Sequence, residues 1–397
     1  MSVTAAEYPF ISVTIDTRGM QPLARRATGN IAIVGSPGDI TGVEANVPVQ
    51  IGDETEARKH FTTPDPETGA VEKSSPLYRS LRTALLQDPA PSRVYAVPTG
   101  PVSQGGGGEA QVSPYEAALI AAASLPVQLV CLAEETAPAN LELLKNHVDE
   151  VSKAGSARIG VAMVKPDLQG NFAETAATDY AAVKSDLSRM ILVAARVAPE
   201  KENGPLPDVA AAVTGAIAGY PPHASVLMKQ VRGFRIPLAR QFSGTEIKKL
   251  AGSLIIPVID PELIPGEGLF LGSGRCFTTD TSKLYVDIVR VLDHIEFLLK
   301  AGLIGTIGET RIDRLGMQGL RARIDGILGP LLTSGVIAGY TIEIPLLPVL
   351  EAEEAALTPG QSDTLSDARK DRRVEVLLSV TYAGAVHFLN INLALKA

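Results

Sequence analysis

The sequence predicts an α/β fold in which helices cover a sheet, and three observations lead to that expectation. Short apolar strand patterns alternate with amphipathic helix patterns along the middle of the chain, as they do when helices pack on a sheet. Hydrophobic residues make up 45% and charged residues 20% of the 397 residues, a balance that allows a large buried core. Aromatic residues are only 5% and tryptophan is absent, so we expect a core of aliphatic side chains and alanine.

Periodicity predicts the elements of the first half of the chain. Alternating residues favour a half-buried strand over 11–15, and an apolar run favours a buried strand over 30–35 that ends at a Gly-Ser-Pro-Gly turn. Further strands are expected over 47–51, 93–97, 127–132, 157–164 and within 187–198. Helices are expected over 54–61, 76–86, 115–123, 140–153 and 208–219. Four consecutive glycines at 105–108 predict a flexible loop.

Longer helices characterise the last third of the chain. An apolar stripe predicts one helix over 282–299, and a second helix is expected over 312–333, ending at Gly335. Strand patterns follow over 340–344 and 373–382.

Two further segments complete the C-terminal pattern. Pro359, Gly360 and many small polar residues predict an exposed loop between the last two strands. The final residues alternate again, with one apolar face made of Leu389, Ile391, Leu393 and Leu395.

Charge and cysteine content exclude several classes of protein. Lys plus Arg is 36 and Asp plus Glu is 44, a net charge of −8 that disfavours nucleic acid as the main partner. The two cysteines, Cys131 and Cys276, form neither a disulfide framework nor a zinc-binding spacing. The first residues lack the pattern of a secretory signal, and no apolar run reaches membrane-spanning length. We therefore expect no membrane insertion and a chain that is made and stays in a cytoplasm.

No motif for catalysis or cofactor binding stands out. The turn at 35–38 follows a strand but lacks the glycine spacing of nucleotide-binding loops, and Pro37 removes a backbone donor, so a plain turn is favoured. The five histidines are not at metal-ligand spacing from one another or from a cysteine. The acidic pairs at Glu134 and Glu135 and at 351–354 are interpreted as solvated charge. The sequence thus predicts no enzyme, no metal and no cofactor; a soluble α/β enzyme with a nucleotide-binding sheet remains the alternative.

The two chain ends carry strand patterns with no obvious neighbour in sequence. At the N-terminus, Ile11, Val13 and Ile15 share one face, and the C-terminal segment presents the apolar face described above. Each end either pairs within its own sheet or adds as a strand to a neighbouring subunit. A head-to-tail contact of the second kind does not close on itself and generates a helical filament.

Several segments together resemble the tail sheath proteins of contractile phages and related injection systems. The helix at 285–296, YVDIVRVLDHIE, resembles the family's VRRLLxxIE helix, and SGVIAGY at 334–340 resembles its GALAGY turn. Residues 268–277 resemble the WGARTL strand, although the family tryptophan is missing there. Residues 27–61 resemble the family's opening strand, glycine turn, strand and short helix, and 374 to the C-terminus resembles its closing strands.

The resemblance implies a multi-domain tail-sheath fold. It would comprise an N-terminal linking arm (1–22), a mixed-sheet α/β region (23–280), a C-terminal α/β domain (281–385) and a C-terminal linking arm (386–397). The arms would add to a sheet of neighbouring subunits. The resemblance places the receiving strands at Tyr340, Ile342, Val376, Leu378 and Val380.

The resemblance also implies partners and a location. The chain would form stacked six-fold rings around an inner tail tube and would meet baseplate and tail terminator proteins, without binding nucleic acid directly. It would belong to a virion tail assembled in the host cytoplasm or to a cytoplasmic or released injection particle. A basic helix at 312–333 is expected to face the tube through Arg314, Arg321 and Arg323. The alternative is that these arginines form only the solvated face of an amphipathic helix.

Overall fold

The computed structural model describes residues 27–64, 71–101, 113–199, 204–261, 264, 268–353 and 356–387. These residues form two compact units. The larger unit contains the described residues of 27–296, 332–340 and 380–387, and the smaller unit contains those of 297–331 and 341–379. The glycine run and both predicted terminal strands lie outside the described residues. The apolar residues of those two strands are Ile11, Val13, Ile15, Leu389, Ile391, Leu393 and Leu395.

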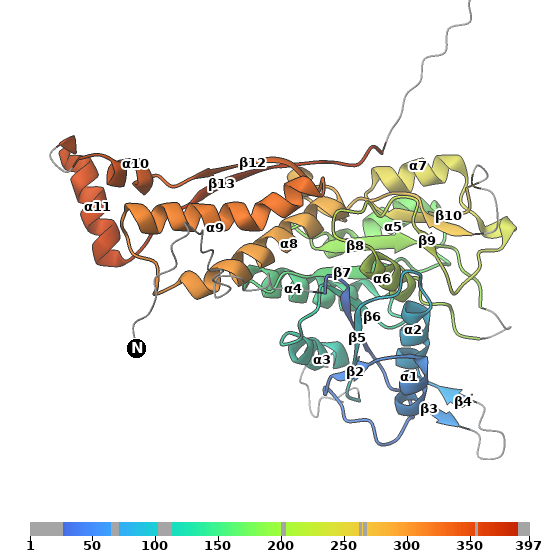
Figure 1. The fold of residues 1–397 in the computed structure, drawn as a ribbon. Helices are drawn as coiled ribbons and strands as arrows, with labels where there is room; N and C mark the ends of the chain where they lie inside the picture. The colour runs from blue at the N-terminus through green and yellow to red at the C-terminus, as the bar shows by residue number, and fades with distance from the viewer. Residues whose placement is uncertain are drawn as a thin grey trace, which may run out of the picture. The chain divides into compact units, whose positions relative to one another are not determined.

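Strands and helices alternate through the larger unit, as the sequence predicts (Figure 1). The strands are β1 (Asn30–Gly35), β2 (Val49–Ile51), β3 (Thr62–Pro64), β4 (Val71–Ser74), β5 (Arg93–Pro98), β6 (Leu129–Leu132), β7 (Ile159–Met163), β8 (Met190–Ala194), β9 (Gln230–Val231), β10 (Ile256–Ile259), β11 (Leu269–Leu271), β12 (Ile337–Glu343) and β13 (Leu377–Tyr382). The α-helices are α1 (Glu54–Phe61), α2 (Pro76–Leu85), α3 (Pro114–Ala122), α4 (Pro138–Lys153), α5 (Phe172–Asp179), α6 (Val209–Gly219), α7 (Gly244–Gly252), α8 (Val286–Leu303), α9 (Arg314–Thr333), α10 (Leu346–Glu351) and α11 (Pro359–Asp371). The α/β fold class is confirmed.

A nine-stranded mixed sheet forms the centre of the larger unit. Its order among the described residues is β2-β5-β1-β6-β7-β8-β10-β11-β9. The strands from β5 to β10 run parallel to their neighbours, whereas β2, β11 and β9 pair antiparallel at the two edges. Parallel strands need crossover connections, which the helices between them supply. The predicted mixed sheet is therefore present.

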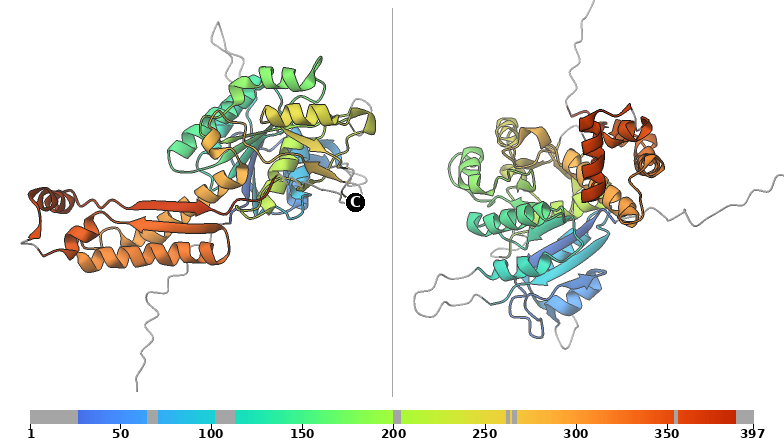
Figure 2. Two further views of the ribbon diagram at one scale, coloured as in Figure 1. Left: turned by 90° about the horizontal axis from the view of Figure 1, so that it is seen from above. Right: turned by 90° about the vertical axis from the view of Figure 1, so that its left-hand side faces the viewer.

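Helices cover both faces of this sheet, which explains why its central strands are apolar throughout. Ile31 and Ile33 of β1 point to the face covered by α1, α2 and α6, whereas Ala32 and Val34 point to the face covered by α3, α4, α5 and α7. Figure 2 shows helices on the two sides of the strands. Strands buried on both faces read as continuous apolar runs rather than as alternating patterns.

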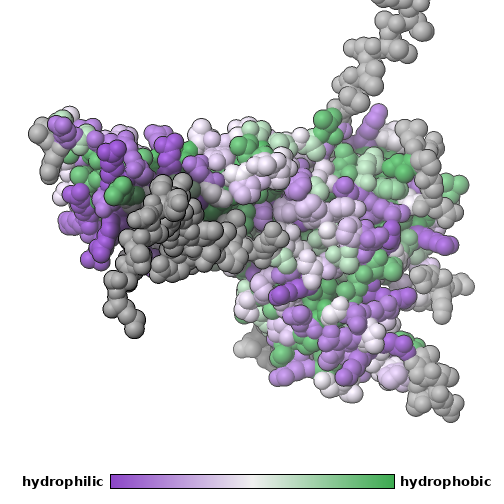
Figure 3. All heavy atoms as spheres, viewed as in Figure 1, coloured by the Kyte–Doolittle hydropathy of each residue, from purple (hydrophilic) through white to green (hydrophobic). Residues whose placement is uncertain are grey.

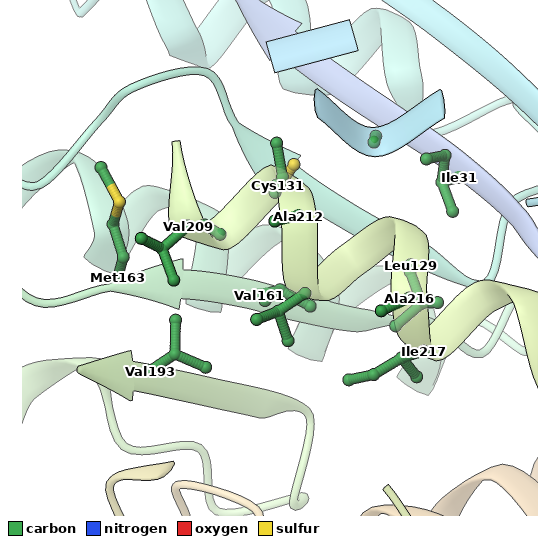
Figure 4. Close-up of a cluster of buried hydrophobic side chains, with 14 of the residues drawn as sticks. Ile31, Leu129, Cys131, Val161, Met163, Val193, Val209, Ala212, Ala216 and Ile217 are labelled. Atoms are coloured by element: carbon green, nitrogen blue, oxygen red, sulfur yellow. The ribbon is translucent and has the colours of Figure 1, made fainter. Parts of the chain in front are cut away.

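Small residues on α6 allow it to lie directly on the strands. Val209, Ala212 and Ala216 pack against the β6, β7 and β8 side chains, as the close-up in Figure 4 shows. On another side of the helix, a Cβ added at Gly215 would lie 2.4 Å from the Ala84 carbonyl oxygen of α2. The alanine-rich sequence of α6 thus reflects close packing on both the sheet and a neighbouring helix.

The smaller unit has its own apolar core. The core residues come from α9, from α10 and the residues just before it, and from α11: Met317, Ile344, Leu346, Leu347, Val349 and Leu365. Ile342 and Val376 pack against this cluster from the strand side. The unit therefore buries apolar side chains of its own, although its elements also continue into the larger unit.

The expected loop at 359–360 is wrong, because these residues begin helix α11. Thr358 accepts a hydrogen bond from the Gln361 amide, the Gln361 side chain accepts one from the Thr358 amide, and Pro359 occupies the first turn. This capping box starts a helix even though nearly all of its residues are polar. The only side chain of α11 that is buried among its described residues is Leu365.

Several other boundaries differ from the sequence prediction, and three elements begin three or four residues from the predicted position. Strand β12 begins at Ile337 rather than at residue 340, β13 begins at Leu377 rather than at 373, and α8 begins at Val286 rather than at 282. Alternation alone does not show where a strand finds a partner, so it misplaces strand ends. Strand β11 lies within residues 268–277, where the family resemblance places a strand. Four strands and three helices were not expected at all: β3, β4, β9, β10, α5, α7 and α10.

Candidate assembly interface

Strands β12 and β13 form a two-stranded sheet, and they carry four of the five predicted receiving residues. Tyr340 and Ile342 lie on β12, and Leu378 and Val380 lie on β13, whereas Val376 lies one residue before β13. Among the described residues, no third strand pairs with either strand. A two-stranded sheet has two edges, and an edge is where a further strand can add.

The two faces of this pair of strands differ. The five receiving residues are all half-buried, while their neighbours Thr341, Glu343, Leu377 and Ser379 are exposed. Leu377 exposes 49% of its surface. The half-buried side chains fix which face the strands present to their own subunit, so the register of any added strand would be constrained by that alternation.

The three predicted arginines of α9 are all exposed, but they do not share one face. Arg314 and Arg321 are seven residues apart, so they lie on nearly the same side of the helix. Arg323 lies about 180° around the helix axis from Arg314, because each residue turns the helix by about 100°. The buried residues of α9, such as Met317 and Ile324, lie between these two sides.

Arg323 instead lines a shallow hollow beside the connection from α8 to α9. The hollow has a volume of about 430 Å³, and its lining includes the charged residues Glu309, Arg311 and Asp313 and the apolar residues Leu315 and Leu320. Leu315 is 78% exposed, and the nearby Ile304 and Ile307 are 67% and 75% exposed. Arg314 and Arg321 therefore lie on one exposed side of α9, whereas Arg323 lies in a hollow lined by both charged and apolar residues.

A second exposed basic cluster lies at the end of α11, and sequence reasoning missed it. Arg369, Lys370, Arg372 and Arg373 are all exposed. Figure 3 shows hydrophilic side chains gathered over this end of the smaller unit. Two features of the sequence could have indicated it. The capping box at Thr358 predicts the start of a helix, and the basic residues lie near its C-terminal end, where the helix dipole stabilises cations.

A third region to consider is the position where doubly wound sheets hold ligands. The connections reverse direction between β1 and β6, and ligands of such sheets bind outside the carboxyl ends of the strands at this point. Here the position is occupied by a network of protein side chains. Arg79 donates two hydrogen bonds to Glu134, at 2.6 and 2.7 Å.

Asp208 completes this network. Its carboxylate accepts hydrogen bonds from the Ser80 hydroxyl at 2.6 Å, from the Glu134 amide at 2.9 Å and from the Ala211 amide at 2.9 Å, which caps α6. Burial raises the pKa of Asp208 despite these hydrogen bonds, and burial likewise raises the pKa of Glu134 against the effect of Arg79.

The interpretation of Glu134 as solvated charge is therefore wrong. Its side chain is 18% exposed and paired with Arg79, and its backbone adopts φ of +53°, a conformation that non-glycine residues seldom adopt. The neighbouring Glu135 accepts hydrogen bonds from the Thr136 and Ala137 amides. These polar groups satisfy one another, so the geometry gives no free donor set for a nucleotide phosphate among the residues described here.

No helix in the described part of the chain is long and apolar enough to cross a membrane. Within the same residues, no group of three or more histidine, cysteine or acidic side chains is placed to hold a metal ion.

Comparisons with known proteins place this fold. No protein-family model matches the sequence, and no curated protein matches it either. Among solved structures, the sheath of the PVC extracellular contractile injection system in its contracted state has a TM-score of 0.70 at 15% identity and covers 99% of each chain. The contracted helical sheath of the anti-feeding prophage has a TM-score of 0.68 at 14% identity, over 99% of this chain and 100% of that one.

A bacterial sheath tail protein shows the same likeness over less of the chain. The crystal structure of a sheath tail protein from Listeria innocua has a TM-score of 0.55 at 13% identity and covers 80% of this chain and 88% of its own. The architecture described above is thus the fold of contractile sheath proteins, as the sequence resemblance predicts. At identities this low, the likeness shows the fold alone.

Proposed function

We propose that this chain is a structural subunit of a contractile sheath. The observation that carries the proposal is the match of 99% of the chain to the contracted PVC sheath subunit, including the smaller unit as well as the sheet. The proposed subunit polymerises as stacked six-fold rings around an inner tube. The sheath then shortens and widens, which drives the tube through a target envelope.

In this proposal, the chain ends link neighbouring subunits. The N-terminal segment with Ile11, Val13 and Ile15 and the C-terminal segment with Leu389, Ile391, Leu393 and Leu395 add strands to the β12–β13 pair of other copies. The pairing of β12 with β13 alone among the described strands supports this arrangement, because an added strand gains backbone hydrogen bonds and buries alternate side chains. Since each copy would both give and receive strands, the contact propagates as a helical lattice.

The contact with the tube is proposed to be electrostatic. Arg314 and Arg321 form one exposed basic flank of α9, and Arg323 lies apart from them in the hollow. Exposed ion pairs contribute about 0–1 kcal/mol each and weaken with salt, so they can register subunits on an acidic tube and still release during contraction. The basic end of α11 offers a competing surface for the same role.

No cofactor enters this mechanism. The extended lattice is proposed to be metastable and to convert when a baseplate triggers it, with the two states differing in how the subunits pack. The particle would be a virion tail or an injection device assembled in a cytoplasm, and a tail terminator would cap it. The likeness to injection-system sheaths and to sheath tail proteins is compatible with either.

Negative-stain microscopy of the purified protein tests the proposal. A sheath subunit is expected to form striated tubes or sheath fragments, because its contacts do not close. Compact isolated particles at all concentrations and salt conditions would contradict it and would favour the alternative of a soluble α/β enzyme.

A further inference from the structure

The segment that follows β13 is fastened to its own subunit at two points. At the first, the Tyr382 hydroxyl donates a hydrogen bond to the Asp287 carboxylate at 2.7 Å. At the second, the His387 ring lies within hydrogen-bond distance of the Ser225 hydroxyl, at 2.9 Å. The residues between these points, 383–386, are exposed and belong to no helix or strand.

The inner fastening is the firmer of the two. Asp287 is only 3% exposed and lies in the first turn of α8, where the helix dipole favours a carboxylate. A hydrogen bond to an ionised group is stronger than one between neutral groups. Tyr382 is also the last residue of β13, so strand pairing holds its backbone as well.

The outer fastening is more exposed to solvent. The His387 ring packs edge-on against the Tyr285 ring, with 4.7 Å between the ring centroids, and makes one hydrogen bond to Ser225. Gly274 leaves room for the ring, since an added Cβ there would lie 3.3 Å from the His387 Cε1 atom. His387 and Ser225 are both half-exposed, so water can replace this hydrogen bond at low cost.

We propose that residues 382–387 form a releasable strap, in which the outer contact at His387 opens while the inner contact at Tyr382 holds. Opening frees residues 383–387, and these five residues span at most about 18 Å when extended. The strap deepens the proposed sheath function and rests on it for its use: it gives the C-terminal segment a reserve of length while a linked neighbour moves. The strap itself is a property of the single subunit.

Limited proteolysis of the unassembled protein tests the strap. Elastase cleaves after small aliphatic residues, and Ala383, Ala385 and Val386 offer such sites between the two fastenings. A protease needs its substrate extended and free, so cleavage reports how often the outer contact opens. Cleavage would be followed by mass spectrometry for His387→Ala, Ser225→Ala and Tyr382→Phe, with His223→Ala as the control at an exposed histidine elsewhere in the same unit.

His387→Ala and Ser225→Ala are each expected to raise the cleavage rate within 383–386 by roughly threefold to tenfold, the factor that one neutral hydrogen bond supplies. The His223→Ala control is expected to match the unmodified protein. Unchanged cleavage in both His387→Ala and Ser225→Ala would overturn the proposal, and so would a larger increase from Tyr382→Phe than from His387→Ala. Because the assay uses unassembled subunits, its result is independent of whether the chain forms sheaths.

Discussion

A buried arginine and histidine, Arg158 and His147, illustrate how single residues affect the stability of the larger unit. The Arg158 guanidinium is almost fully buried and donates hydrogen bonds to the carbonyl oxygens of Ala122, Ala123 and Leu125 at the end of α3. It also lies 3.3 Å from the His147 ring nitrogen. Burial first, and the Arg158 charge second, lower the pKa of His147 to about 4. The histidine is therefore neutral in the folded protein at pH 7.

This arrangement predicts a pH dependence of stability. The pKa of an unfolded histidine is about 6.5, so between about pH 6.5 and pH 4 the unfolded chain binds more protons than the folded one. The free energy of unfolding is therefore unaffected by this histidine above about pH 6.5. It falls by up to about 3 kcal/mol as the pH decreases from about 6.5 to below about 4. Urea unfolding at pH 7, 5.5 and 4.5 should show this loss, and His147→Gln should reduce it.

A matched control uses His60, which is exposed on α1. His60→Gln is expected to leave the slope of stability against pH unchanged. If the His147 and His60 variants show the same slope, the buried pair is not its source.

A second residue-scale prediction concerns Val13. If the N-terminal segment pairs with a neighbouring subunit, Val13→Asp removes apolar burial worth roughly 1.5–3 kcal/mol from the lattice and none from the monomer. Sedimentation should then show impaired assembly, while the thermal midpoint of the monomer stays within about 1 °C, which for a chain of this length is equivalent to ~0.8 kcal/mol. A large drop in monomer stability would place this strand within its own fold.

At this scale, the sequence could not reveal the important polar contacts. Arg79 and Glu134 are 55 residues apart, and Asp208 lies a further 74 residues along the chain. Nothing in their local surroundings distinguishes them from solvated charge. Only the sheet topology brings them to one place, so a long-range ion pair of this kind cannot be predicted from spacing.

At the scale of elements, the C-terminal segment gives the clearest prediction. Deleting residues 386–397 should leave a soluble monomer that unfolds cooperatively, because the described core lies in other elements. The same deletion should prevent polymerisation, as judged by sedimentation velocity and negative-stain microscopy. Deleting only 388–397 retains His387 and should give the same loss of assembly. Normal sheaths from either truncation would contradict the proposed role of the arm.

The two basic helices can be compared by charge reversal. The triple variant Arg314→Glu, Arg321→Glu and Arg323→Glu should yield sheaths that assemble empty or already contracted, because repulsion replaces weak attraction to an acidic tube. A matched variant of α11 carries Arg369→Glu, Lys370→Glu and Arg373→Glu. Cryo-electron microscopy of sheath co-expressed with its tube would distinguish them. Normal extended sheaths from the α9 variant would refute a tube contact on α9. A defect confined to the α11 variant would assign the tube contact to α11 instead.

Prediction of elements succeeded where burial imposes a pattern and failed where it does not. Strands β1, β6, β7 and β8 are buried on both faces, and their apolar runs were recognised. Helix α11 buries one residue, Leu365, so its polar sequence was interpreted as a loop. The pair Thr358 and Gln361 carried the helix signal instead, and capping residues are easily overlooked within a polar segment.

At the scale of the whole molecule, the α/β class and the sheath fold were both predictable from the sequence. The alternation of elements gave the class, and the helix at 285–296 with the turn at 334–340 gave the family resemblance. The division into two units was less predictable. Their boundary passes through α8, α9, β12 and β13, and a pattern of element types does not show where one core ends and another begins.

A helical reconstruction of the assembled protein by cryo-electron microscopy tests the central claim most directly. The account predicts stacked six-fold rings in which the β12–β13 pair of each subunit is extended by strands from neighbouring copies, one carrying Ile11, Val13 and Ile15 and the other carrying Leu389, Ile391, Leu393 and Leu395. A closed oligomer, or a polymer in which β12 and β13 remain a two-stranded sheet, would contradict it.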